Sequence, residues 1–240
     1  MPITSDRTRL YYHDVPKIAC TSLKILFWEL ENGRKFPHRT STPTFFRRAM
    51  HHLGLPGAAG TPRIHATEGY QTRSWKASAA PPPGYETLVV LRDPVERLYS
   101  AWKNKARSRV FSARDELDDL TNEGLPHDPD LGTFIEMFDE YRQVSRPVRI
   151  HTNHYSWHLG PDIEYFDHVF TLQDMGSLIA FLATRAGTNL AMPHRNKSAK
   201  KERSDKLSKP QLNRLAKITE PDYLWLKGKY SLEQSLHRFL

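Results

Sequence analysis

The chain has 240 residues, enough for one sizeable α/β domain with a buried core. Lys and Arg outnumber Asp and Glu by 35 to 27, and the resulting net charge of +8 favours anionic partners such as nucleotides, acidic glycans, nucleic acids and membrane surfaces. No apolar run approaches the roughly 20 residues that span a bilayer, and no secretory signal is visible. The single cysteine, Cys20, excludes an internal disulfide. We therefore expect one soluble, cytoplasmic domain over residues 1–240.

The N-terminal region predicts a strand, a tight turn and a helix. Residues 1–9 have the composition of a polar arm, and the apolar run Leu10–Tyr12 predicts the strand. Helical spacing then begins after Cys20 and ends at Gly33, a natural stop; the apolar positions of this helix are Leu23, Phe27 and Leu30. The turn therefore leads directly into a helix N-terminus.

This turn has the chemistry of an anion site. Backbone N–H groups in such a turn, together with the positive end of the helix dipole, form a concavity for a phosphate or sulfate group. Thr21 and Ser22 add hydroxyl donors, and Lys17 adds a mobile cation. The order differs from the Walker pattern, in which glycines precede a Gly-Lys-Ser/Thr triplet. An ordinary turn with a solvated lysine is the alternative.

A second strand and helix follow a connecting region. Residues 34–63 are rich in basic residues, Pro and Gly, with a short helix expected over Thr44–His52, and Arg63–Glu68 predicts a short strand. Residues 76–84 predict a surface loop because of their Pro and Ala content. Residues 87–91 then form a continuous apolar run typical of a parallel strand covered on both faces.

The residues after this strand form a second basic cluster. Asp93 is a good N-cap and Pro94 a good first helical residue, so the helix boundary is well defined. Arg92 stands at the carboxyl end of the strand, where ligands bind in open α/β sheets. The simpler alternative is that Arg92 and Arg97 pair with Asp93 and Glu96 on the surface.

The rest of the chain predicts mostly core elements. We expect a loop over 106–130, a helix over about 131–144, a strand over 168–172, a helix capped by Asp174 and ending at Gly187, and helices from about 209 and around 231–240. The segment 149–158 holds three histidines, but no cysteine or close carboxylate completes a metal site, so we expect none.

Two motifs together resemble the PAPS-dependent sulfotransferases, most closely their carbohydrate-type branch. Pro16-Lys17-x-x-x-Thr21-Ser22 is similar to the family's 5'-phosphosulfate loop, and Arg92-Asp93-Pro94-x-x-Arg97-x-x-Ser100 is similar to its 3'-phosphate element. The resemblance implies a P-loop-like three-layer sandwich, with a central, mainly parallel sheet flanked by helices. It also implies metal-independent, in-line transfer of the sulfuryl group of PAPS to an acceptor hydroxyl, with release of PAP.

The resemblance also suggests roles for individual residues. Lys17 would be catalytic, and the cofactor-binding residues would be Lys17, Ile18, Ala19, Cys20, Thr21, Ser22, Arg92 and Ser100, joined by Asn196, Lys197 and Ser198 of a loop that closes over the nucleotide. His65 is the candidate general base, with Glu68 in reserve. His154 and Trp157 would line the acceptor cleft, although packing explains them equally well. The chain departs from the family at Cys20, where Gly or Ser is commoner, and at Gln173, where an acidic residue is common.

Two other classes of function share parts of this pattern. A P-loop kinase or hydrolase would share the strand, loop and helix, but it should carry a glycine-rich loop and an acidic Mg²⁺ ligand after a strand, where this chain has Arg92. A nucleic-acid-binding protein would explain the charge, yet no recognisable binding module is present. The acceptor is expected to be a carbohydrate or glycoconjugate, and basic residues around 34–48 and 195–209 would suit an anionic glycan. The oligomeric state is not indicated.

Overall fold

The computed structural model describes residues 2–37, 64–106, 114–191 and 206–240. The helix expected over Thr44–His52 and the predicted nucleotide-covering residues Asn196, Lys197 and Ser198 lie outside these ranges. Within the described ranges, no helix combines the length and the apolar content needed to cross a membrane.

The described residues form a four-stranded sheet in the order β1-β2-β3-β4. Its strands are β1 (Ile3–Ser5), β2 (Leu10–His13), β3 (Glu86–Leu91) and β4 (His168–Thr171). β2, β3 and β4 are mutually parallel, with Tyr12 opposite Leu88 and Val89 opposite Val169, whereas β1 runs antiparallel to β2. The carboxyl ends of the three parallel strands therefore share one edge of the sheet. The predicted α/β class with a mainly parallel sheet flanked by helices is confirmed.

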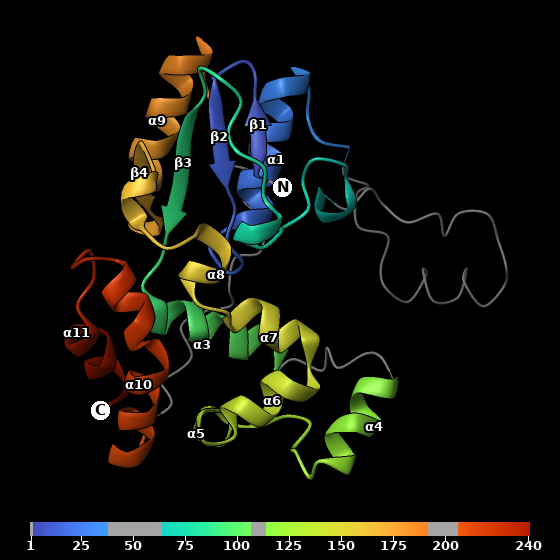
Figure 1. Cartoon of the computed structure of the whole chain (residues 1–240), viewed down its shortest axis with the longest axis vertical. Helices are drawn as coiled ribbons and strands as arrows, with labels where there is room; N and C mark the ends of the chain where they lie inside the picture. Colours follow the sequence, from blue (N-terminus) through green and yellow to red (C-terminus); the bar gives the residue numbers. More distant parts are fainter. Residues whose placement is uncertain (1, 38–63, 107–113, 192–205) are drawn as a thin grey trace, which may run out of the picture.

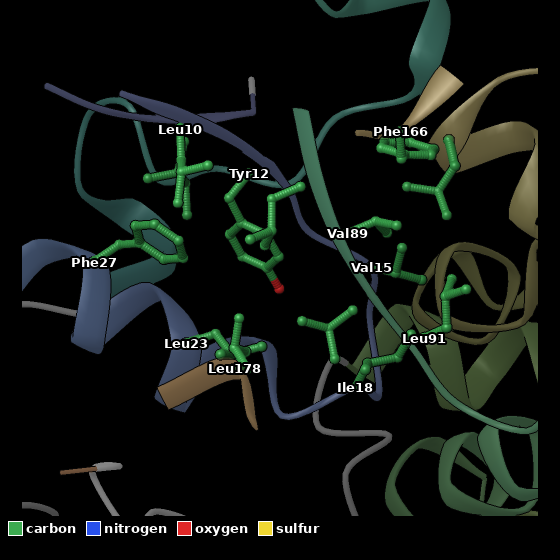
Figure 2. Close-up of a cluster of buried hydrophobic side chains, with 14 of the residues drawn as sticks. Leu10, Tyr12, Val15, Ile18, Leu23, Phe27, Val89, Leu91, Phe166 and Leu178 are labelled. Carbon is green, nitrogen blue, oxygen red and sulfur yellow. The ribbon is translucent and has the colours of Figure 1, made fainter. Parts of the chain in front are cut away.

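Long helices cover one face of this sheet. α1 (Cys20–Asn32) places Phe27 against Tyr12 of β2, with the two rings stacked 5.0 Å apart, and α9 (Met175–Ala186) places Phe181 against Phe170 of β4. Figure 2 shows Leu10 and Tyr12 among the side chains that pack with Phe27. Burial of these large side chains supplies the main stabilisation of the sheet.

Short elements cover the opposite face. His13 is packed among aromatic rings there, 5.6 Å from Trp75 and 5.2 Å from Phe166 between ring centroids. The covering elements are η2 (Trp75–Ala77), α8 (Tyr155–Leu159) and η3 (Ile163–Tyr165). Burial lowers the pKa of His13 to about 4, so this imidazole is a neutral core side chain at physiological pH.

A second group of helices lies beyond the carboxyl ends of the parallel strands (Figure 1). Its members are α3 (Pro94–Lys105), α4 (Arg114–Asn122), α5 (Leu131–Glu136), α6 (Phe138–Val144), α7 (Arg146–Thr152), α10 (Lys209–Trp225) and α11 (Leu232–Leu236), followed by η5 (His237–Phe239). They share a separate core that includes Trp102, Phe134, Tyr141 and Phe239. The edge of the sheet where ligands bind is therefore enclosed by helices.

Several predicted boundaries are confirmed. The Asp93 side chain accepts the Glu96 N–H as an N-cap, and Pro94 is the first residue of α3. Gly33 and Gly187 end α1 and α9 in the left-handed conformation, with φ of 61° and 60°, which glycine adopts without strain. Asp174 precedes α9 as expected, but its carboxylate accepts from the Thr171 hydroxyl instead of capping the helix.

Four expectations about local structure are wrong. Residues 1–9 are not simply a polar arm, because Ile3–Ser5 pairs with β2 and Ser5 hydrogen-bonds Glu31. The strand expected over Arg63–Glu68 is instead the 3-10 turn η1 (Ile64–Ala66), since Ile64 alone is buried and the residues after it are polar and turn-forming. The loop expected over 106–130 contains α4, and the helix expected over 131–144 is interrupted at Met137, whose ψ is 31°.

A buried ion pair joins two members of the helical group, α3 and α10. The Arg97 guanidinium lies 2.9 Å from the Asp222 carboxylate, with both side chains only 4% exposed. Arg97 also donates to the Asn153 carbonyl at 2.7 Å, and Asp222 accepts the Tyr155 N–H at 2.7 Å. Although burial opposes ionisation of Asp222, the Arg97 charge holds its pKa below the usual value. The alternative that Arg97 pairs with Asp93 or Glu96 on the surface is therefore wrong: Arg97 is buried, and its partner is Asp222.

We predict that Asp222→Asn lowers the free energy of unfolding by about 3–5 kcal/mol, because the buried Arg97 charge loses its counter-ion. Urea denaturation at pH 7 measures this loss. Because the folded pKa of Asp222 is depressed, the stabilisation is present at neutral pH and is lost as the pH falls through that pKa. Lys227→Met is the control, since its pairs with Asp162 and Glu164 are exposed and should contribute little to stability. Equal losses in both variants would contradict the prediction.

Candidate functional site

The two predicted motifs meet at the carboxyl ends of β2 and β3. Residues 14–19 connect β2 to α1, and Arg92 follows β3. The Arg92 guanidinium donates to the Lys17 carbonyl at 3.1 Å, so the second motif directly holds the backbone of the first. Lys17 and Arg92, which the sequence analysis placed in separate motifs, are therefore in direct contact.

The backbone of the loop is strained in a way that exposes its N–H groups. Lys17 and Ala19 have φ of 72° and 49°, a left-handed conformation that costs a non-glycine residue roughly 1–3 kcal/mol. Ala19 is the N-cap of α1, and among the described residues no side chain caps this helix. The first N–H groups of α1, at Cys20, Thr21 and Ser22, have no partner within the helix. They are available to an anion, as the sequence predicts.

Lys17 adds a poorly solvated cation beside this concavity. Burial, together with the nearby charges of Lys105 and Arg92, lowers the pKa of its ammonium to about 8. Among the described residues, the Lys17 ammonium has no hydrogen bond or ion pair. A bound phosphosulfate group would offset both the burial of the Lys17 ammonium and its repulsion from the neighbouring cations, because it supplies the negative charge that these cations lack.

A buried network of hydrogen bonds and one ion pair anchors the loop 14–19 at its first residue, Asp14. The Lys24 ammonium, fully buried, lies 2.9 Å from the Asp14 carboxylate and donates to the Thr72 hydroxyl at 2.9 Å and the Tyr70 carbonyl at 2.6 Å. The Thr72 hydroxyl donates in turn to Asp14 at 2.5 Å. All three ammonium protons of Lys24 are thereby satisfied. This network was not predicted, although a lysine among the apolar positions of α1 was a signal for it.

His65 comes to the loop from η1. Its Nε2 lies 2.9 Å from the Thr21 hydroxyl, although the two residues are 44 positions apart. The imidazole is exposed at its outer edge, while the protein atoms around it and the Lys24 charge lower its pKa below 6.5. Glu68 is exposed and makes no hydrogen bond or ion pair with the described residues. The geometry thus brings His65, and not Glu68, to the loop.

Two residues that the sequence analysis did not select are electrostatic neighbours of Lys17. Burial, together with the charges of Lys105 and Lys17, lowers the pKa of His151 to about 4, and His65 is a further electrostatic neighbour. His151 Nδ1 lies 2.7 Å from the Pro147 carbonyl, which can only accept, so this nitrogen carries the proton and Nε2 does not. Lys105 ends α3, and His151 belongs to α7, which packs against α3. Only the tertiary structure brings them to Lys17.

The second motif is only partly free for a ligand. Besides contacting Lys17, Arg92 pairs with Glu96 at 3.2 Å, and Glu96 also pairs with Arg238. The surface pairing considered for Arg92 is therefore present for one of its nitrogens. Ser100 is half-buried on α3, two helical turns beyond Arg92. A phosphate at Arg92 would share this arginine with Glu96.

The histidines of the segment 149–158 do not converge. His151 Nδ1 lies 2.7 Å from the Pro147 carbonyl, whereas His154 Nδ1 lies 3.2 Å from the Asp222 carboxylate and His158 is buried. The described residues contain no group of three His, Cys, Asp or Glu side chains arranged to hold a metal. His154 lines a surface pocket with residues of α6 and α10. Trp157 is not among the residues that line this pocket; it is 41% exposed and packs edge-on against His158.

Comparison with known proteins identifies one family. A model of the sulfotransferase family matches residues 2–236, nearly the whole chain. Neither a search of curated proteins nor a search of solved structures found a match. The family match confirms the resemblance to PAPS-dependent, carbohydrate-type sulfotransferases, and it argues against the kinase and nucleic-acid-binding alternatives. The chain belongs to the sulfotransferase family, and PAPS is its co-substrate.

Proposed function

We propose that this enzyme transfers the sulfuryl group of PAPS to a hydroxyl of a carbohydrate or glycoconjugate, using the loop 14–19 and the carboxyl end of β3 as the nucleotide site. The observation that carries the proposal is the hydrogen bond from Arg92 to the Lys17 carbonyl, which joins the two anion-binding motifs. In this arrangement the N–H groups of residues 18–22 and the hydroxyls of Thr21 and Ser22 hold the 5'-phosphate. Arg92 and Ser100 hold the 3'-phosphate. Asn196, Lys197 and Ser198 are proposed to cover the nucleotide.

The transfer step needs a cation at the leaving oxygen and a base at the acceptor. The acceptor oxygen attacks sulfur while the bond from sulfur to the bridging phosphate oxygen breaks, so negative charge grows on that oxygen as PAP leaves. The Lys17 ammonium stabilises this charge. His65, neutral at pH 7 because its pKa is lowered, accepts the proton of the acceptor hydroxyl. His151 is a second candidate base, since its unprotonated Nε2 belongs to the same cluster.

PAP should raise the melting temperature of the protein, because a ligand that binds only the folded state stabilises it. At a concentration near 100 Kd the expected rise is about 5 °C or more. Differential scanning fluorimetry with PAP, AMP, ATP and no ligand measures it, and AMP, which lacks the 3'-phosphate, should stabilise less. Arg92→Ala should remove the advantage of PAP over AMP. A variant that keeps the full PAP preference would exclude Arg92 from the 3'-phosphate site.

Replacement of Lys17 should affect both rate and pH dependence. Lys17→Ala should lower kcat by about 10²–10³, the usual loss when one transition-state donor is removed. In the wild type, kcat/KM should fall above about pH 8, because Lys17 loses its proton there. Lys17→Arg keeps its charge and should abolish this fall. A pH–rate profile of sulfate transfer to an acceptor sugar provides the measurement, and an unchanged alkaline limb in Lys17→Arg would contradict the assignment.

Replacing each histidine separately tests which one is the base. His65→Ala should lower kcat/KM by about 10²–10⁴, whereas His127→Ala, an exposed histidine bonded to Thr121, should have no effect. The base must be unprotonated, so activity is lost as the pH falls through its pKa, which for His65 lies below 6.5. Full activity in His65→Ala, with an acid limb near pH 4 that disappears in His151→Ala, would transfer the role to His151.

A further inference from the structure

A pocket of about 290 Å³ is lined by residues of α6, α10 and the segment before α8. Its lining residues are Phe138, Asp139, Arg142, His154, Arg214, Lys217 and Ile218. None of these residues belongs to the loop 14–19 or to the Arg92 motif. The pocket is therefore distinct from the proposed nucleotide site.

The lining carries three cations against one carboxylate. Arg214 pairs with Asp139 at 3.0 Å and donates to the Ile135 carbonyl, so these two charges are mutually compensated. Arg142 donates to the Thr152 hydroxyl and the Asn153 side-chain oxygen, at 2.9 and 3.0 Å, both of them neutral acceptors. Lys217 is exposed, and within the described part of the chain it has no ion pair. Arg142 and Lys217 thus leave the pocket with an uncompensated positive charge.

The cations are combined with a nonpolar wall and a fixed histidine. Phe138 and Ile218 supply nonpolar surface, and Phe138 also packs under the Arg142 guanidinium, 5.3 Å from its ring centroid. His154 is oriented by Asp222, which accepts from Nδ1 at 3.2 Å and leaves Nε2 for a ligand. A ligand that satisfies all these groups has a negative charge, a nonpolar face and further hydroxyls. A sugar ring that bears a carboxylate or a sulfate has this chemistry.

We propose that this pocket binds an acidic sugar ring and serves as a second subsite for an anionic glycan acceptor. The assignment of the pocket as an acceptor subsite rests on the proposed function, whereas the binding of an acidic sugar to the pocket does not depend on that function. The segment 151–154 lies between the two sites, because His151 belongs to α7, which packs on α3 beside Lys105 and is electrostatically coupled to Lys17, and His154 lines the pocket. A glycan bound here is held next to the wall of the transfer site, which would select charged acceptors over neutral ones.

Calorimetric titration of the full chain tests the pocket with three probes. These are an unsulfated uronic acid–hexosamine tetrasaccharide, the same tetrasaccharide with its carboxylates reduced to alcohols, and inorganic sulfate. The acidic tetrasaccharide should bind, and the neutral form should bind about tenfold more weakly, because a charge-assisted contact is lost. Equal binding of the acidic and neutral forms would overturn the proposal. Sulfate alone binding as tightly as the acidic tetrasaccharide would overturn the assignment to a sugar.

Two variants with matched controls locate the site. Lys217→Glu should weaken binding of the acidic tetrasaccharide about tenfold, whereas Lys229→Glu, the same charge change at an exposed lysine outside the pocket, should not. Asp139→Asn should strengthen binding about twofold to fivefold, because it removes the carboxylate that competes for Arg214, while the neighbouring Glu140→Gln should not. Identical effects of a variant and its control would show attraction by overall charge and overturn the pocket assignment.

Stabilisation by PAP, measured on the same samples, separates the two proposals. Stabilisation by PAP without variant-specific binding of the saccharide would overturn the pocket alone. Variant-specific saccharide binding without any response to PAP would support the pocket as a sugar site and count against its role as an acceptor subsite.

Discussion

The buried ion pair between Asp14 and Lys24 is the interaction on which the proposed nucleotide site depends. Asp14 directly follows β2 as the first residue of the loop 14–19, Lys24 lies in the second turn of α1, and the pair joins the two. Because the ammonium also bonds Tyr70 and Thr72, the same contact secures the segment that follows His65. Removing one partner of such a pair leaves a buried charge, which costs about 3–5 kcal/mol. The network can therefore hold Lys17 and Ala19 in a left-handed conformation that they would not adopt alone.

Above this network, the site is arranged for negative charge that the protein does not itself provide. Besides burial, the charges of Lys105 and Arg92 lower the pKa of Lys17, and the only described carboxylate paired with Arg92 is Glu96. Like charges held together destabilise the ligand-free protein, and a ligand with several phosphate and sulfate oxygens reverses that effect. Burial is the main cause of the lowered pKa values of His65 and His151, and nearby lysine charges lower both further. A neutral imidazole beside a cationic ammonium is the pairing that sulfuryl transfer requires.

The sequence predicted what depends on local chemistry and missed what depends on tertiary contact. Asp93 and Pro94 define the start of α3, and the apolar run before them defines β3, so this part of the site was predictable residue by residue. His151 gave no such signal, because its role depends on α7 packing against α3 and on one backbone carbonyl that fixes its tautomer. Arg97 shows the converse error. Its spacing on α3 suggested a surface residue, but its partner Asp222 is 125 positions away and buried.

That distant partner also explains how the two proposed sites are held together. Asp222 accepts the Tyr155 N–H and the His154 ring nitrogen while it neutralises Arg97, which in turn holds the Asn153 carbonyl. Residues 153–155 are thus fixed between α3 and α10; His154 belongs to this anchored stretch, and His151 lies just before it. Because Arg97 belongs to the same helix as Ser100 and Lys105, α3 positions both the nucleotide motif and the segment proposed to contact the acceptor. Relative placement of donor and acceptor then depends on one rigid helix and not on flexible loops, which suits a reaction whose rate depends on in-line alignment.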